Sequence, residues 1–171
     1  MSREGQRFRF LKLLEIADLN GCTVLDVGSG LGDLYPFVRD RFPRAEYSGI
    51  DIVAEMVERA SEKYPEITFR QGNLLVDSLP ERYDYVLLSA IFNNAIPEPT
   101  DFLQALVERA FALCRRGLGF NFLSTHVNFS EPTMAYHDPA RVVEFCISRL
   151  SRRVRLEHHY ERCDVAVFVY R

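Results

Sequence analysis

An apolar segment runs directly into three closely spaced glycines at residues 24–34, where the sequence reads VLDVGSGLGDL. The apolar residues at 22–27 predict a buried strand, and the residues from about 33 to 42 predict a helix that follows without a linker. Glycines at such a turn let a ligand approach the main chain next to the amino terminus of the helix. The segment therefore predicts an α/β fold with a ligand-binding turn.

Strand and helix patterns alternate along the rest of the chain, which is typical of a parallel sheet covered by helices on both faces. The strands expected in this region cover residues 22–27, 45–50, 67–70, 83–89 and 118–123. Two more, at 153–158 and 164–170, leave no room for a helix between them and must form a hairpin, so one of the pair runs antiparallel. We expect a single doubly wound, mostly parallel α/β domain spanning residues 1–171.

The charge of the glycine turn indicates the kind of ligand. Asp26 lies two residues before the first glycine, and Asp33 stands where a dinucleotide-binding G-x-G-x-x-G turn needs a small residue. Two carboxylates beside the turn would repel a pyrophosphate and favour a ligand that carries positive charge. S-adenosylmethionine, with a sulfonium and an ammonium, is such a ligand.

Polar residues also follow the next three strands. Asp51 ends the second strand, 25 positions after Asp26, where a carboxylate can accept both hydroxyls of a ribose. Asn73 and the main chain of Leu74 follow the third strand and can meet an adenine. Ser89 ends the fourth, where it would lie nearest the methyl group of S-adenosylmethionine. All of them lie at the carboxyl ends of parallel strands, where open α/β sheets bind ligands.

The acidic-x-G-x-G-x-G turn, Asp51, Asn73 and the closing hairpin make the chain resemble class I S-adenosylmethionine-dependent methyltransferases over about residues 22–171. The resemblance implies a seven-stranded sheet whose last strand is inserted antiparallel between the fifth and the sixth. It also implies that the glycine turn approaches the methionine half of the cofactor, that Asp51 holds the ribose, and that Asn73 borders adenine, where the family more often has Asp. Residues 1–21 would form a helix that covers the cofactor site.

The expected cofactor-binding residues share the carboxyl edge of the sheet: Asp26, Gly28, Ser29, Gly30, Asp51, Ile52, Asn73, Leu74 and Ser89. The sequence SAIFNN after the fourth strand lacks an N-P-P-Y-type tetrad, which disfavours amino-methylation of nucleobases or glutamine by that motif. On the first predicted helix, a solvated face is favoured for Arg7 and Arg9 over contact with the cofactor carboxylate.

The candidates for catalysis are two histidines, His126 just beyond the fifth strand and His137 before the last helix. A neutral imidazole can accept a proton from an acceptor hydroxyl as the methyl group arrives. If His126 has this role, His126→Ala should lower turnover by roughly 10²–10⁴ and leave cofactor affinity nearly unchanged. An amine acceptor would need no general base. Asp138 is interpreted as a helix cap.

Composition limits the remaining possibilities. The net charge of −3 over 171 residues argues against a nucleic-acid partner, and no apolar run approaches the ~20 residues of a membrane span. Four scattered cysteines predict reduced thiols in a cytoplasm and no metal site. We expect a cytoplasmic monomer or homodimer that methylates an oxygen or nitrogen of a small molecule. The alternatives are an NAD-dependent oxidoreductase and a non-catalytic methyltransferase-like binding subunit.

Overall fold

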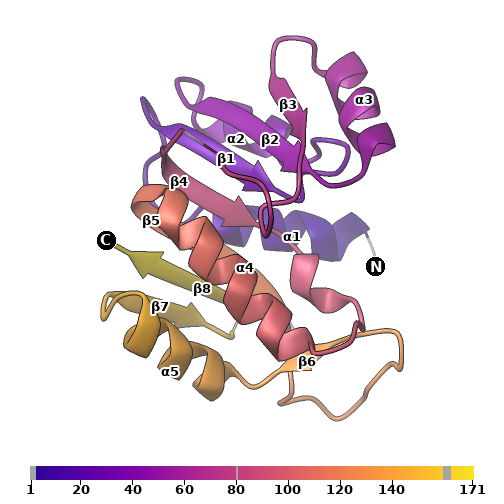
Figure 1. Cartoon of the computed structure of the whole chain (residues 1–171), viewed down its shortest axis with the longest axis vertical. Coiled ribbons are helices and arrows are strands. Elements are labelled where there is room, and N and C mark those ends of the chain that lie inside the picture. The colour runs from indigo at the N-terminus through magenta and orange to yellow at the C-terminus, as the bar shows by residue number, and fades with distance from the viewer. Residues whose placement is uncertain (1–2, 80, 160–162) are drawn as a thin grey trace.

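The computed structural model describes residues 3–79, 81–159 and 163–171 (Figure 1). Within these residues eight strands form one sheet in the order β3-β2-β1-β4-β5-β8-β7, and β6 pairs with β5 beside this path. The strands are β1 (Thr23–Val27), β2 (Glu46–Asp51), β3 (Thr68–Gln71), β4 (Tyr83–Leu88), β5 (Cys114–Ser124), β6 (Tyr136–His137), β7 (Val154–Glu157) and β8 (Asp164–Tyr170).

Helices cover both faces of the sheet (Figure 1). They are α1 (Arg3–Leu13), α2 (Tyr35–Arg41), α3 (Ala54–Lys63), α4 (Pro99–Leu113) and α5 (Pro139–Arg149), with a 3₁₀ turn η1 (Ile91–Asn93). One apolar core lies between the sheet and α4 and α5, around residues such as Val86 and Phe120. A second lies on the opposite face, where Leu13 of α1 and Val38 of α2 pack near Leu87. The expected α/β fold class is therefore confirmed.

The closing hairpin has the predicted arrangement. β8 lies antiparallel between β5 and β7, with Val167 opposite Phe120 on one side and Leu156 on the other. The side chains of β8 are almost all buried, whereas every residue of β7 is half-buried, as expected for an edge strand. The two-residue strand β6, parallel to the end of β5, is an addition that the sequence did not indicate.

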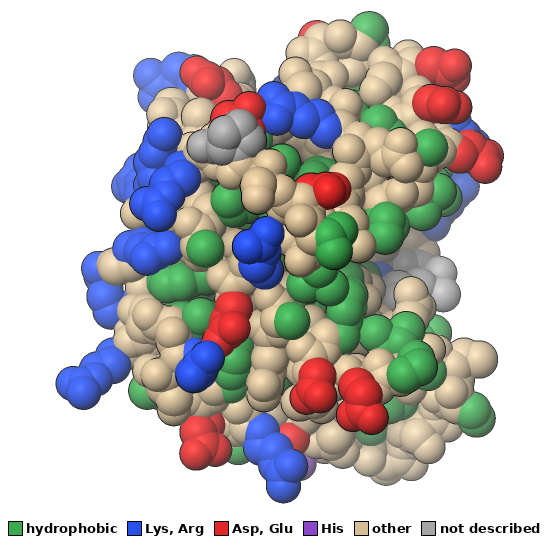
Figure 2. All heavy atoms as spheres, viewed as in Figure 1, with side chains coloured by type: hydrophobic (Ala, Val, Ile, Leu, Met, Phe, Trp, Pro, Cys, Tyr) green, Lys and Arg blue, Asp and Glu red, His purple; other side chains and the backbone are tan. Residues whose placement is uncertain are grey.

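The strands β1, β2 and β4 end side by side, because Val27 is level with Ile50 in one neighbour and with Leu88 in the other. Figure 2 shows Lys and Arg side chains gathered on the left of this face, where the parallel strands of Figure 1 begin, with fewer on the right, where they end. The carboxyl edge of the sheet is thus not a basic surface in this view. No helix in the described part of the chain is long and apolar enough to cross a membrane.

Candidate functional site

The glycine turn is held against the end of β2 by main-chain hydrogen bonds. The N–H groups of Gly28 and Ser29 donate to the Ile50 carbonyl at 2.8 and 3.1 Å. The Gly30 N–H donates to Oδ2 of Asp51 at 2.8 Å. Gly28 and Gly30 have φ angles of 70° and 53°, in the left-handed region that favours glycine. The turn therefore depends on its glycines and on the Asp51 carboxylate.

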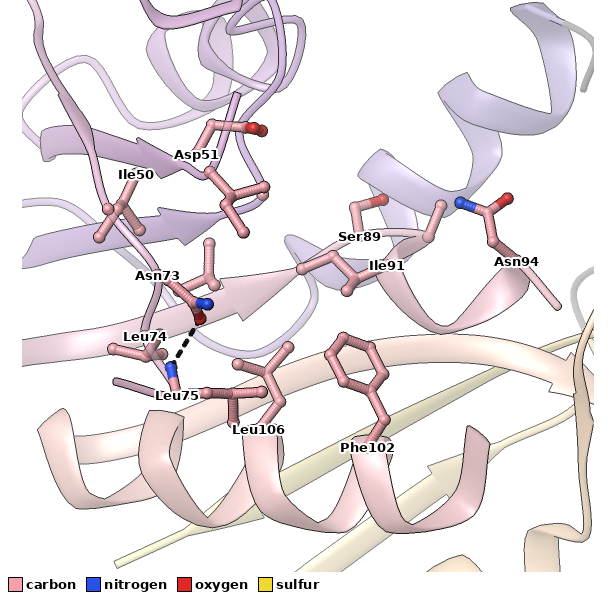
Figure 3. A pocket seen from close by; sticks show the side chains of 15 residues that line it. Ile50, Asp51, Asn73, Leu74, Leu75, Ser89, Ile91, Asn94, Phe102 and Leu106 are labelled. Atoms are coloured by element: carbon pink, nitrogen blue, oxygen red, sulfur yellow. Dashed lines mark hydrogen bonds between the residues drawn. The ribbon is translucent and has the colours of Figure 1, made fainter. Parts of the chain in front are cut away.

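A cavity of about 400 Å³, which we call the strand cavity, opens between the ends of the strands and helix α4. Asp51, Asn73, Leu74, Ser89 and Leu106 are among the residues that line it (Figure 3). The second carboxylate oxygen of Asp51 accepts the Val53 N–H at 2.9 Å, and Oδ1 of Asn73 accepts the Leu75 N–H at 3.0 Å. Hydrogen bonds from nearby main-chain N–H groups thus orient the side chains of Asp51 and Asn73.

A second cavity of about 260 Å³, the loop cavity, lies between the glycine turn and α1. Helix α1 contributes Arg3, Gln6, Arg9 and Phe10 to its wall. The turn contributes Asp26, which is only 3% exposed and accepts the Tyr47 hydroxyl at 2.6 Å. Burial raises the pKa of Asp26 to about 7, although the hydrogen bond from Tyr47 acts in the opposite direction. The loop cavity therefore contains a carboxyl group that titrates near neutral pH.

The two cavities share the residues Gly28, Ser89 and Ala90. The Ser89 hydroxyl oxygen is buried and has no hydrogen-bond partner among the described residues. Ala90 has a φ of 60°, and its N–H donates to Oδ1 of Asn121 at 2.7 Å. Asn121 is fully buried in β5, and the sequence analysis did not single it out. The sequence could have indicated Asn121, because it is the polar residue in the apolar run LGFNFL.

All of the expected cofactor-binding residues line these cavities. Asp51, Ile52, Asn73 and Leu74 line the strand cavity, Asp26, Ser29 and Gly30 line the loop cavity, and Gly28 and Ser89 line both. Residues from four strand ends and the glycine turn are thus brought together at one edge of the sheet.

Neither candidate catalytic histidine lines the strand cavity or the loop cavity. His126 is exposed and lies in a groove beside α5, with its ring centroid 6.4 Å from that of His158. Its N–H donates to the Ser124 hydroxyl at 3.0 Å, where the chain turns at the end of β5. The expectation that its position beyond β5 directs His126 into the cofactor pocket does not agree with this geometry.

His137 is 3% exposed and lines a separate cavity formed with residues of α4 and α5. Its Nε2 lies 3.0 Å from the Phe92 carbonyl. Burial lowers the pKa of His137, and the hydrogen bond with Phe92 acts in the opposite direction. The pairing of β6 with β5 explains this position, since it turns the ring toward η1. Asp138 caps α5 as predicted, accepting the Ala140 N–H at 2.9 Å.

The expectation of a solvated helix face is correct for Arg7, which is exposed, and wrong for Arg9, which is 5% exposed. The guanidinium of Arg9 lies 3.5 Å from Oδ2 of Asp164, the first residue of β8. Because α1 packs across the sheet through Phe10 and Leu13, the side of the helix that carries Arg9 also turns inward.

Comparison with known proteins gives matches over the part of the chain that contains the glycine turn and the strand ends. A family model described as "Methyltransferase domain" matches residues 24–117. "Putative methyltransferase Rv1506c" of Mycobacterium tuberculosis (strain ATCC 25618 / H37Rv) is 28% identical over 153 residues, covering 86% of this chain and 92% of that protein. Trans-aconitate 2-methyltransferase of Afipia carboxidovorans (strain ATCC 49405 / DSM 1227 / KCTC 32145 / OM5) is 32% identical over 90 residues. That match covers 53% of this chain and only 35% of the longer relative.

Among solved structures, magnesium protoporphyrin IX methyltransferase from Synechocystis PCC 6803, with bound SAH, superimposes with a TM-score of 0.75. The match covers 98% of this chain and 82% of that one. At 20% sequence identity, this likeness establishes the shared fold.

Proposed function

This chain belongs to the methyltransferase-domain family, and on that premise we propose that it transfers a methyl group from S-adenosylmethionine to a small-molecule acceptor. The observation that carries the proposal is the pair of cavities that meet at Gly28, Ser89 and Ala90. The strand cavity has one carboxylate, Asp51, and neutral polar groups that suit a nucleoside, and the loop cavity has groups of both charges that suit an amino acid.

S-adenosylmethionine is the methyl donor, and its sulfonium supplies an already activated methyl group. The residues fit this molecule. In the strand cavity, Asp51 would accept the ribose hydroxyls, while Asn73 and the Leu74 N–H would meet the adenine. The orphaned Ser89 hydroxyl at the junction supports the presence of a polar ligand there, since buried polar groups rarely lack a partner.

In the loop cavity, Asp26 would accept a hydrogen bond from the cofactor's ammonium group. Its hydrogen bond from Tyr47 fixes the direction of the carboxylate before a ligand arrives. Gly28 brings the main chain close to the junction, where a Cβ atom would lie only 2.7 Å from Ile91. These residues would align the donor and exclude water, which is the main demand that methyl transfer makes on a protein.

The acceptor would be a nucleophile that needs no general base from the protein. Among the described residues, neither cavity is lined by a histidine. A carboxylate is ionised at neutral pH, and an unprotonated amine has a free electron pair, so positioning is sufficient for both. The relatives named for trans-aconitate and for malonyl-[acyl-carrier protein] support a carboxylic acid, although this chain spans about a third of their length.

The two other functions considered are less well supported. Asp26 beside the glycine turn disfavours the pyrophosphate of NAD, whereas Asp33 is paired with Lys63 at 2.7 Å. A non-catalytic binding subunit has no need of a buried carboxyl group and an open junction between two cavities.

The test is calorimetric titration of the purified chain with S-adenosylhomocysteine and, separately, with NADH. We expect binding of the first and none of the second. Methyl transfer from labelled S-adenosylmethionine is then measured against small carboxylic acids and amines. Binding of NADH alone would favour the oxidoreductase. Binding of S-adenosylhomocysteine without turnover on any acceptor in a metabolite extract would favour the binding subunit.

A further inference from the structure

His137 is a buried titratable group that the proposed methyl transfer does not use. Its ring packs against those of Phe92 and Phe122, and the residue is only 3% exposed. Nε2 lies 3.0 Å from the Phe92 carbonyl, and because a carbonyl can only accept, Nε2 carries the proton of the ring. Burial lowers the pKa of His137, which favours the neutral ring. Nδ1 is therefore a hydrogen-bond acceptor.

This acceptor has no hydrogen-bond partner among the residues that the structure describes. His137 lines a cavity of about 410 Å³, which we call the helix cavity, between the starts of α4 and α5 and beside β6 (Figure 1). Nδ1 is the ring nitrogen left to meet a ligand there. A buried acceptor without a partner is costly, so a donor from a ligand or from water is expected at this position.

We propose that the helix cavity binds a neutral polyhydroxylated molecule, such as a sugar, and that one of its hydroxyl groups donates to Nδ1 of His137. The helix cavity shares no lining residue with the strand cavity or the loop cavity. It is thus a second site, and the inference does not depend on the proposed function.

The charges of the helix cavity favour a neutral ligand. Its wall contains one carboxylate and one guanidinium, those of Asp138 and Arg141, with Oδ2 and Nε 4.0 Å apart. Oδ1 of Asp138 also accepts the Ala140 N–H at 2.9 Å. Outside the wall, the exposed residues Glu98 and Asp101 lie at the start of α4. The wall is therefore balanced in charge, and the acidic residues beside it disfavour an anion.

The uncharged polar groups of the wall suit hydroxyl groups, since they too both donate and accept hydrogen bonds. They are the hydroxyls of Thr100, Thr125 and Tyr136 and the carboxamide of Gln104. The Tyr136 hydroxyl accepts the Glu131 N–H at 3.1 Å and so keeps its own hydrogen for another acceptor. The volume of the cavity is within the range of small-molecule sites.

The test observes the His137 ring directly by ¹⁵N NMR of the whole chain, with and without S-adenosylhomocysteine. The neutral probes are glucose, galactose, mannose, ribose and myo-inositol. We expect the Nε2–H tautomer in the free protein and an upfield shift of Nδ1 with at least one probe, as a hydrogen bond to this nitrogen forms. Glucuronate and glucosamine, which carry a charge, should bind about two- to fivefold more weakly than the best neutral probe.

Variants of His137 test its role. His137→Phe keeps an aromatic ring and removes the acceptor, so the affinity for the best neutral probe should fall about 2- to 12-fold, the scale of one neutral hydrogen bond. His137→Gln retains an N–H group for the Phe92 carbonyl and serves if His137→Phe fails to fold. His126→Phe, at an exposed histidine outside the cavity, is the control and should change nothing.

A second pair of variants tests the charge balance. Arg141→Met leaves Asp138 without its cation, so glucosamine should gain affinity relative to the best neutral probe. Arg115→Met removes an exposed arginine that does not line the cavity and should leave the order of the probes unchanged.

An unchanged Nδ1 shift with every neutral probe would overturn the inference and leave the helix cavity filled by water. Tighter binding of glucuronate or glucosamine to the wild-type chain would overturn the assignment of a neutral ligand. Full affinity for the best neutral probe in both His137→Phe and His137→Gln would remove His137 from the site. Failure to bind S-adenosylhomocysteine with a normal response to the neutral probes would overturn the proposed function alone.

Discussion

The strand cavity and the loop cavity differ in how the chain assembles them. The strand cavity is built from the ends of neighbouring parallel strands, and its charged group is Asp51. The loop cavity combines Asp26 of the first strand with Arg3 and Arg9 of a helix that precedes the sheet. The strand cavity follows from local motifs and strand register, whereas the loop cavity requires two distant parts of the chain to pack together.

The difference extends to electrostatics. In the strand cavity, hydrogen bonds from Val53 and Gly30 already satisfy both oxygens of Asp51 in part. In the loop cavity, Asp26 and Arg9 are both nearly inaccessible to water, where charges interact strongly and protonation is sensitive to the surroundings. Changes in one cavity should therefore be separable from changes in the other by the choice of ligand.

The largest expected effect comes from Gly28→Val, because Gly28 lines both cavities. The new side chain would meet Ile91 and fill the junction, so we expect no detectable binding of S-adenosylhomocysteine or of 5′-methylthioadenosine, which lacks the amino-acid part. Calorimetry of both ligands checks this.

The control is Gly21→Val. Gly21 has the same φ of 70°, but no atoms lie within 4 Å of a Cβ placed there. Both variants should lose about 1–3 kcal/mol of stability from backbone strain. Only Gly28→Val should lose binding, and retention of tight binding there would make the glycine turn purely structural.

Asp51→Ala is expected to weaken binding in the strand cavity directly, and to loosen the glycine turn of the loop cavity through the lost hydrogen bond from Gly30. Losing hydrogen bonds to an ionised group should cost about 1.5–3 kcal/mol, or roughly 10- to 150-fold in affinity. The loss should be at least as large for S-adenosylhomocysteine as for 5′-methylthioadenosine, since both carry the ribose and only the first would also occupy the loop cavity. Asp40→Ala, on an exposed surface carboxylate, is the control and should change neither affinity. An unchanged dissociation constant in folded Asp51→Ala would remove Asp51 from the site.

A pH titration is expected to affect only the loop cavity. Since the pKa of Asp26 is about 7, the carboxylate that would face the ammonium is mostly neutral at pH 6 and mostly ionised at pH 8. Affinity for S-adenosylhomocysteine should rise about tenfold between these values by proton linkage. Affinity for 5′-methylthioadenosine should stay level, and Asp26→Asn should abolish the difference. A pH-independent affinity for both ligands would argue against contact between Asp26 and the ammonium.

The Asp26 contribution to the stability of the unliganded chain should fall as pH rises, whereas the affinity for S-adenosylhomocysteine should increase. The pKa of Asp26 is raised from 3.8 to about 7 on folding, so the folded state holds an extra proton between these values. The contribution of Asp26 to stability is therefore present at low pH and is lost as pH rises through about 7. Asp26→Asn, compared with wild type by denaturant unfolding across pH 5–8, isolates this contribution.

The polar residues of the strand cavity could be predicted from the sequence. Asp51, Asn73 and Ser89 each end a strand, and parallel strands in register bring such ends together. The hairpin was also predictable, because the segment between residues 158 and 164 is too short for a helix. These inferences depend only on local pattern and on the geometry of parallel sheets.

The loop cavity was harder to predict. Arginines at positions 3, 7 and 9 of a strongly polar helix look alike in the sequence, and only packing decides which one turns inward. The contact between Arg9 and Asp164 joins residues 155 positions apart. His126 posed a related problem, since the direction of the chain after β5 depends on the turn at Ser124 and on the pairing of β6.

The smallest effect is expected at His126, which lies outside both cavities. Because its ring lies in the groove beside α5, His126→Ala should leave turnover and cofactor affinity within about threefold, far from the 10²–10⁴ loss typical of a missing general base. His158→Ala, in the same groove, is the matched control. Turnover of both variants is measured from pH 5.5 to 9 with the best acceptor found. A loss of turnover of 100-fold or more in His126→Ala alone would show that the segment after β5 takes part in catalysis. It would also favour general-base catalysis over positioning alone.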